Sequence, residues 1–146
     1  MDSDATDLES LQVILLSATE NLHVGSAAFF VRAPDSTGLV VAAAAGISGA
    51  ALEGLAAAVR DPTHPIARTL VDGEATFDVA PRAPGGPALR SHLPLLADHG
   101  GRQATLGVLA VAHENPLDED ARRALVELAD RAASAIHASS ALDRAP

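Results

Sequence analysis

The stretch from Arg90 to Ile136 constrains the fold of this 146-residue chain more than any other part. Two apolar segments, 91–96 and 104–112, flank a turn with paired glycines, and a long helix rich in leucine and alanine follows. A strand that is apolar on both faces must be covered from both sides, so the pattern predicts an interior hairpin. The second segment places Leu106, Val108 and Ala110 on one face and Leu109 and Val111 on the other.

Two residues of this hairpin restrict what can lie beside it. Pro94 has no backbone N–H, so its nitrogen must face a sheet edge, a bulge or a ligand cavity. Gly107 has no side chain and therefore lets another group come close to the backbone. We expect these two residues to lie on neighbouring strands.

Capping and turn residues organise the rest of the chain. A capping box at Thr6–Glu9 starts a helix, and Ser48 can cap another. Gly73 is placed to end a short helix that begins near Pro65. The predicted order is a helix from Thr6, strands at 26–31 and 39–45, two helices, a strand at 75–79, an irregular Pro/Gly loop at 80–89, strands at 91–96 and 104–112, and a helix over 118–143.

Clustered strands with helices at both ends predict an α+β fold, in which a sheet carries a helical layer. The length suits one domain, which we assign to residues 6–143, with flexible ends at 1–5 and 144–146. Apolar residues make up 48% of the chain but include only three aromatics, so alanine, valine and leucine must fill the core.

Composition excludes several classes of function. The net charge is −9 and every basic residue is arginine, which argues against a nucleic-acid surface. The absence of cysteine excludes disulfides, thiolate nucleophiles, thiolate-bound metals and thioether-linked chromophores. The acidic N-terminus lacks the features of a signal peptide, and no segment has the apolar length of a membrane span. We therefore expect a cytoplasmic protein that has no membrane partner.

The chain resembles a GAF domain over roughly residues 8–141. Gly46 closes the second strand, and a short helix with the sequence Ile66–Glu74 precedes the strand that ends at Val79. The resemblance continues through the hairpin and the last helix. The segments that carry it there are Ser91–Leu95, Thr105–Val111 and Ala132–Ile136.

The resemblance implies a central antiparallel sheet of about five or six strands. It places the N- and C-terminal helices together on one face, and loops and short helices over a small-molecule pocket on the other. It further implies a sensory or regulatory domain, not an enzyme, that binds a small organic ligand and dimerises through its terminal helices. Occupancy of the pocket would then shift the packing of those helices. The alternative is a degenerate domain with a closed pocket that serves only in dimerisation or protein docking.

The ligand signatures of known family branches do not carry over to this sequence. Asn115–Glu119 has Pro and Leu where cyclic-nucleotide binders have Lys and Phe. Bilin-binding and sulfoxide-reducing members need cysteine, which is absent. The 81–87 loop lacks the histidine that haem-sensing members place there. We therefore predict no cofactor, and the ligand is of unknown identity.

Four residues are candidates for contact with the ligand. His92 lies on the strand beside the expected pocket and titrates near neutrality, although a structural role is the simpler interpretation. Arg68 and Arg90 could hold an anion, with surface ion pairing as the alternative for Arg68. Phe77 could line the cavity, or it could pack in the core as most apolar aromatics do.

Catalytic and metal sites are not expected. Ser91 and His92 are neighbours on a strand and must point to opposite faces, so they cannot form a nucleophile–base pair. The six histidines show no close-spaced pair that would place two imidazoles on one metal. Only a convergent cluster of histidine and acidic residues in the fold would reopen the question.

In the last helix, a coiled-coil-like seam predicts a homodimer: Ala121, Leu125, Leu128, Ala132, Ala135, Ser139 and Leu142.

Overall fold

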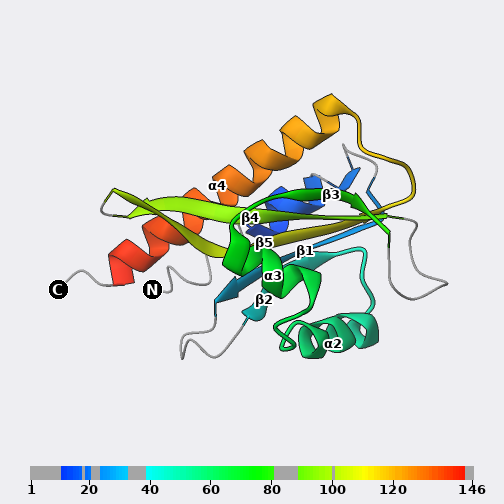
Figure 1. Cartoon of the computed structure of the whole chain (residues 1–146), viewed down its shortest axis with the longest axis horizontal. Coiled ribbons are helices and arrows are strands. Elements are labelled where there is room, and N and C mark those ends of the chain that lie inside the picture. The colour runs from blue at the N-terminus through cyan, green and yellow to red at the C-terminus, as the bar shows by residue number, and fades with distance from the viewer. Residues whose placement is uncertain are drawn as a thin grey trace.

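A computed structural model describes residues 11–17, 19–20, 24–32, 39–80, 89–99 and 101–143, without the side chains of 99, 102 and 137–143. The proposed flexible ends, the Thr6–Glu9 capping box and most of the 80–89 loop lie outside these residues. A helix over 11–17 and 19–20 comes first. The elements that follow are β1 (Ser26–Arg32), β2 (Leu39–Ala45), α2 (Gly49–Ala58), α3 (Pro65–Asp72), β3 (Thr76–Val79), β4 (Leu89–His99), β5 (Arg102–His113) and α4 (Glu119–Asp143) (Figure 1).

The five strands form one antiparallel sheet in the order β2-β1-β5-β4-β3. The hairpin predicted from the sequence is β4–β5, which pairs Pro94 with Val108 and Leu95 with Gly107. Pro94 and Gly107 therefore lie on neighbouring strands, as expected. Pro94 also lies beyond Thr76↔His92, the last pair that joins β3 to β4, so the proline is at an edge of the sheet.

The terminal helices cover one face of the sheet. In Figure 1, α4 crosses diagonally above the strands, with the N-terminal helix on the same side. Leu125, Leu128 and Ala132 of the predicted seam are buried there against the sheet, so the seam packs within the chain itself. This larger core includes Leu11 and Leu15 of the first helix and Phe29, Leu93, Leu109 and Val111 of the sheet.

The opposite face carries α2 and α3 and a smaller core. Phe30, Val108 and Ile66 are buried in it, and the half-buried Leu55 packs at its border. None of the residues of α2 is buried. The sheet is thus covered from both sides, which confirms the predicted α+β architecture. No helix among the described residues is long and apolar enough to cross a bilayer.

The first helix also closes an exposed edge of the sheet. β2 is an edge strand, and such a strand leaves backbone groups unpaired unless something covers them. The Gln12 side chain donates through Nε2 to the Ala44 carbonyl at 2.7 Å and accepts from the Ala44 N–H at 3.2 Å. The amide replaces a missing strand partner at this position and fixes the helix to the sheet.

Register irregularities alter one predicted orientation. Between Leu95↔Gly107 and Leu96↔Thr105 the pairing of β4 with β5 skips Leu106. Leu106 consequently packs against the larger core on the α4 face, whereas the alternation placed it with Val108 on the other. The cause is a bulge, which shifts the side-chain alternation by one residue and leaves no mark in the sequence pattern.

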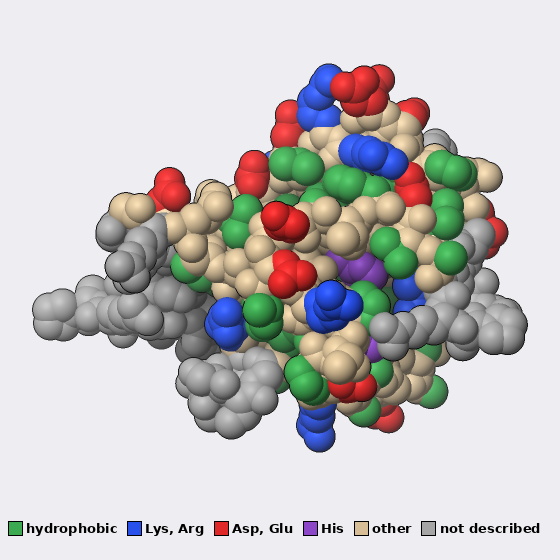
Figure 2. All heavy atoms as spheres, viewed as in Figure 1, with side chains coloured by type: hydrophobic (Ala, Val, Ile, Leu, Met, Phe, Trp, Pro, Cys, Tyr) green, Lys and Arg blue, Asp and Glu red, His purple; other side chains and the backbone are tan. Residues whose placement is uncertain are grey.

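The predicted helix ends are confirmed where the structure describes them. The Ser48 hydroxyl accepts a hydrogen bond from the Ala51 N–H at 3.3 Å and caps α2. Gly73 ends α3 with a left-handed φ of 68°. At the start of α4, Asp118 accepts from the Ala121 N–H at 2.7 Å. Figure 2 shows acidic and basic side chains side by side at the top of the view, where α4 begins.

Gly107 is required by the close contact between β5 and β1. A Cβ built at this position would lie 2.1 Å from the Phe30 carbonyl oxygen, a backbone atom that cannot move aside. The expected close approach of another group to Gly107 is therefore confirmed, and that group is the neighbouring strand.

Substitution of Gly107 with alanine should separate β1 from β5. We expect Gly107→Ala to lower the free energy of unfolding by about 3 kcal/mol, measured by urea denaturation. Gly54→Ala is the matched control, since a Cβ there meets nothing within 4 Å in the middle of α2, and it should add about 0.5–1 kcal/mol. Equal effects at the two glycines would contradict the steric explanation.

Candidate functional site

A cavity of about 270 Å³ lies between the sheet and the α2–α3 side of the molecule. Its floor consists of two rows of side chains that cross β1, β5 and β4. One row runs Ala28–Ala110–His92 and the other Ser26–Ala112–Arg90, as the strand register requires. All six residues share a face because alternate residues of a strand point the same way. Alanine on the central strand leaves the hollow, and the polar groups stand at its borders.

The opposite wall comes from the chain that follows β2. Gly46, Ile47 and Ser48 lead into α2, which contributes Ala51 and Leu55 to the lining. Ile66 of α3 completes this wall. No residue of α2 is buried because the helix stands over the hollow, so α2 is held by fewer apolar contacts than α4.

Arg90 stands at the border of the cavity with part of its hydrogen-bonding capacity unused. The side-chain Nε is buried, and within the described part of the chain no group accepts a hydrogen bond from it. The described ion pairs also leave the Arg90 guanidinium without a carboxylate. A buried donor in this state costs free energy, about 1–3 kcal/mol and more for a charged group.

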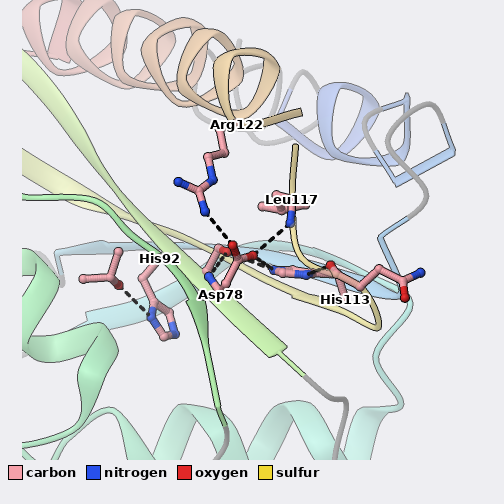
Figure 3. Close-up of polar contacts among 8 residues, drawn as sticks. Asp78, His92, His113, Leu117 and Arg122 are labelled. Atoms are coloured by element: carbon pink, nitrogen blue, oxygen red, sulfur yellow. Dashed lines mark hydrogen bonds and ion pairs between the residues drawn. The ribbon is translucent and has the colours of Figure 1, made fainter. Parts of the chain in front are cut away.

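His92 lies beside Arg90 on the cavity floor and is only 3% exposed. Burial, followed by electrostatic repulsion from His64 and Arg90, lowers the pKa of His92 to about 4. The imidazole is therefore neutral near pH 7. Thr76 Oγ1 lies 3.5 Å from Nδ1, a long contact, and the ring points toward the α2 side in Figure 3.

The other two sequence candidates do not line this cavity. Arg68 is exposed on α3. Phe77 packs against the larger core on the α4 face, where the Arg122 guanidinium stands 4.9 Å from its ring centre. Of the four candidates, Arg90 and His92 come together at the cavity, whereas Arg68 and Phe77 lie elsewhere.

On the opposite face of β4 the structure places a polar cluster that sequence reasoning missed, formed by Asp78, Ser91, His113 and Arg122 (Figure 3). The Asp78 N–H donates to Ser91 Oγ at 3.1 Å, and that hydroxyl lies 2.9 Å from His113 Nε2. His113 Nδ1 is 2.8 Å from the Asn115 carbonyl, which can only accept. The His113 tautomer that carries its proton on Nδ1 fits these contacts, because Nδ1 then donates to the Asn115 carbonyl and Nε2 accepts from the Ser91 hydroxyl.

Asp78 connects this cluster to the start of α4. Its backbone has a left-handed φ of 58°, a conformation that aspartate tolerates better than most residues. The carboxylate accepts from the Leu117 N–H at 2.9 Å and from Arg122 Nη2 at 2.5 Å. The hydrogen bond from Leu117 is the main cause that holds the pKa of Asp78 below its usual value, and Arg122 adds to it.

The geometry of this cluster is that of a structural connection. Asp78 Oδ1 lies 4.0 Å from His113 Nε2, the same nitrogen that faces the Ser91 hydroxyl, whereas a catalytic triad places its carboxylate on the other nitrogen. Ser91 and His113 are almost fully buried and are absent from the cavity lining. Ser91 and His92 lie on opposite faces of β4, as the alternation of side chains along a strand predicts. Among the described residues no group of histidine and acidic side chains could hold a metal ion.

Comparison with known proteins identifies the family. The family profile described as GAF domain matches residues 8–136, most of the chain. The chain belongs to the GAF domain family. GAF domains are typically sensory or regulatory modules. No curated protein matches this GAF domain by sequence.

Solved structures show the same fold. The second GAF domain of DevS from Mycobacterium smegmatis superposes with a TM-score of 0.75 at 22% identity, covering 97% of this chain and 98% of that one. The GAF domain of a phosphoenolpyruvate-protein phosphotransferase from Coxiella burnetii gives 0.75 at 16% identity, covering 95% and 87%. A type II free methionine-R-sulfoxide reductase from Thermoplasma acidophilum gives 0.68 at 12% identity, covering 93% and 96%. The same fold thus occurs in two proteins described as GAF domains and in an enzyme.

Lowering the pH should destabilise this GAF domain through His92. The pKa of His92 is 6.5 in the unfolded chain and about 4 in the folded chain. Between these pH values the unfolded chain binds the proton more strongly, so the free energy of unfolding falls as the pH falls. We expect His92 to account for a loss of about 2 kcal/mol in unfolding free energy between about pH 7.5 and about pH 5. Urea denaturation of His92→Gln should lack that part of the loss. Equal losses in the two proteins would contradict the burial of a neutral imidazole.

Proposed function

We propose that this GAF domain is a cytoplasmic sensory module that binds a small organic ligand in the cavity between its sheet and α2–α3. The proposal rests chiefly on the cavity floor, where alanines of β1 and β5 leave space beside Arg90 and His92. Ligand sites are concave and largely apolar, with a few polar groups that orient the ligand. The cavity has both properties.

Hydrogen bonds through strand β4 connect the cavity to the start of α4. Arg90 and His92 face the cavity, and Ser91 between them points to the other face and contacts His113 and the Asp78 N–H. The Asp78 carboxylate in turn holds the Leu117 N–H and Arg122 at the start of α4. A movement of β4 on ligand binding would reach α4 through these hydrogen bonds. We infer that occupancy shifts the packing of the terminal helices by this route.

We further propose that the domain forms a homodimer through its terminal helices. The seam of α4 packs against the domain's own sheet, so a second copy would have to use other positions. Val13 and Leu16 of the first helix are 66% and 47% exposed, and Val126 of α4 is 41% exposed. Burial of such side chains against a second copy would remove apolar surface from water.

The alternative is a degenerate domain that has lost its ligand and serves only in docking. A filled interior between the sheet and α2 would favour that function, and the cavity favours ligand binding. The two proposals predict different results in one measurement, which is the mass of a small molecule that copurifies with the protein.

Ligand binding can be tested on the purified protein. The chain has no Trp, Tyr or Cys, so near-ultraviolet absorbance above that of three phenylalanines reports a bound aromatic molecule. Native mass spectrometry should give a larger mass than denaturing mass spectrometry, and Ala110→Leu should abolish the difference by filling the floor. Ala57→Leu is the control, because Ala57 is exposed on α2 and lies outside the lining. The absence of any mass difference in the wild type would favour the degenerate alternative.

Dimerisation can be tested independently. Size-exclusion chromatography with light scattering should give the mass of a dimer for the wild type and of a monomer for Val13→Asp. Val71→Asp makes the same change on α3, at a side chain that is 81% exposed on the opposite layer, and should remain dimeric. A monomeric wild type at every concentration, or a dimeric Val13→Asp variant, would rule out the terminal helices as the interface.

A further inference from the structure

We propose that the cavity selects a small organic acid whose carboxylate pairs with Arg90 and whose apolar body lies along the alanine floor. The inference rests on the proposed function, because it names the chemical class of the ligand for the same cavity. Three observations carry it: the charges that line the cavity, the unused hydrogen-bonding capacity of Arg90, and the apolar character of the remaining walls.

The charge of the cavity is opposite to that of the chain. Nineteen acidic residues stand against ten basic ones, yet among the described residues that line the cavity there is no aspartate or glutamate. Arg90 is the cation of the lining, and His92 beside it is kept neutral by its burial. A ligand with one negative charge would balance this site, whereas a cationic ligand would meet repulsion and no acidic partner.

Among the described residues, Arg90 also has no carboxylate partner. Its buried Nε has no acceptor among the described residues, and the described ion pairs do not include it. A carboxylate suits this group because its two oxygens match the paired N–H donors of a guanidinium. The N-terminal end of α2 lines the same cavity at Ser48, and the helix dipole there adds attraction for an anion.

The rest of the lining favours an apolar body of limited size. Ala28, Ala110 and Ala112 form the floor, and Leu55 and Ile66 form part of the opposite wall. A volume of about 270 Å³ is slightly below the usual range for ligand pockets, which is about 300–1,000 Å³, so the ligand must be small. A compact carboxylic acid with a branched or aromatic apolar group matches both the positive charge of Arg90 and the apolar walls of the cavity.

The test uses acids and their neutral amides as matched probes. Benzoate with benzamide and 3-methylbutanoate with 3-methylbutanamide differ mainly in the charged group. The ¹H–¹⁵N signals of the arginine Nε–H groups can be followed by NMR during each titration, and Arg90→Lys identifies the Arg90 signal. Because the chain has ten arginines and no lysine, the other Nε–H signals serve as internal controls.

We expect an acid to shift the Arg90 Nε–H signal and to bind at least about tenfold more tightly than its amide. Arg90→Gln should lower the affinity for the acid by about tenfold to a hundredfold while leaving the affinity for the amide nearly unchanged. Arg68→Gln makes the same change at an exposed arginine outside the lining and should bind like the wild type. Thermal melting of each variant verifies that it is folded.

Three results would overturn the inference, and they differ in what they say about ligand binding. If acid and amide bind equally and Ala110→Leu abolishes both, the cavity binds ligands but does not select an anion. If no acid moves the Arg90 signal at millimolar concentration, Arg90 is not a carboxylate site. The native mass measurement then decides separately whether the cavity holds another ligand, and a neutral or cationic molecule found there would also exclude the anionic class.

Discussion

The alternation of side chains along β1, β5 and β4 is the constraint on which the rest of the structure depends. On one face these strands present Phe29, Leu93 and Leu109, which fill the space beneath the terminal helices. On the other face the centre of the same strands presents Ala28 and Ala110, which are too small to reach α2. A single sheet thereby has one densely packed face that holds the domain together and one face with room for a ligand.

Strand β4 carries polar groups on both of these faces. Arg90 and His92 border the cavity, while Ser91 between them belongs to the buried cluster that reaches α4 through Asp78. The left-handed backbone of Asp78 lets one residue donate its N–H to Ser91 and direct its carboxylate to the start of α4. Cavity and terminal helix are therefore connected by a few hydrogen bonds across one strand, which suits a regulatory domain.

Strong local patterns made most of the fold predictable, and the same patterns located only part of the site. Caps such as Ser48 and Gly73 and the two-faced apolar strands identified the elements and their order. Arg90 and His92 were found because they lie on the strand beside the Pro/Gly loop. Phe77 was equally plausible in the sequence, yet its strand turns it to the α4 face. The Asp78 cluster was missed because its hydrogen bonds join residues that are 13 to 44 positions apart, and no local spacing signals such contacts.

The sequence by itself determined the family, the α+β class, the ends of α2 and α3 and the burial of the β4–β5 hairpin on both sides. These features depend on side-chain periodicity and on backbone preferences that act over a few residues. Only the tertiary structure decided which face of the sheet is hollow, that the α4 seam packs within the chain, and which candidates meet at the cavity. Those outcomes depend on strand register and on bulges such as the one at Leu106, which set the direction of every later side chain through contacts between residues far apart in the chain.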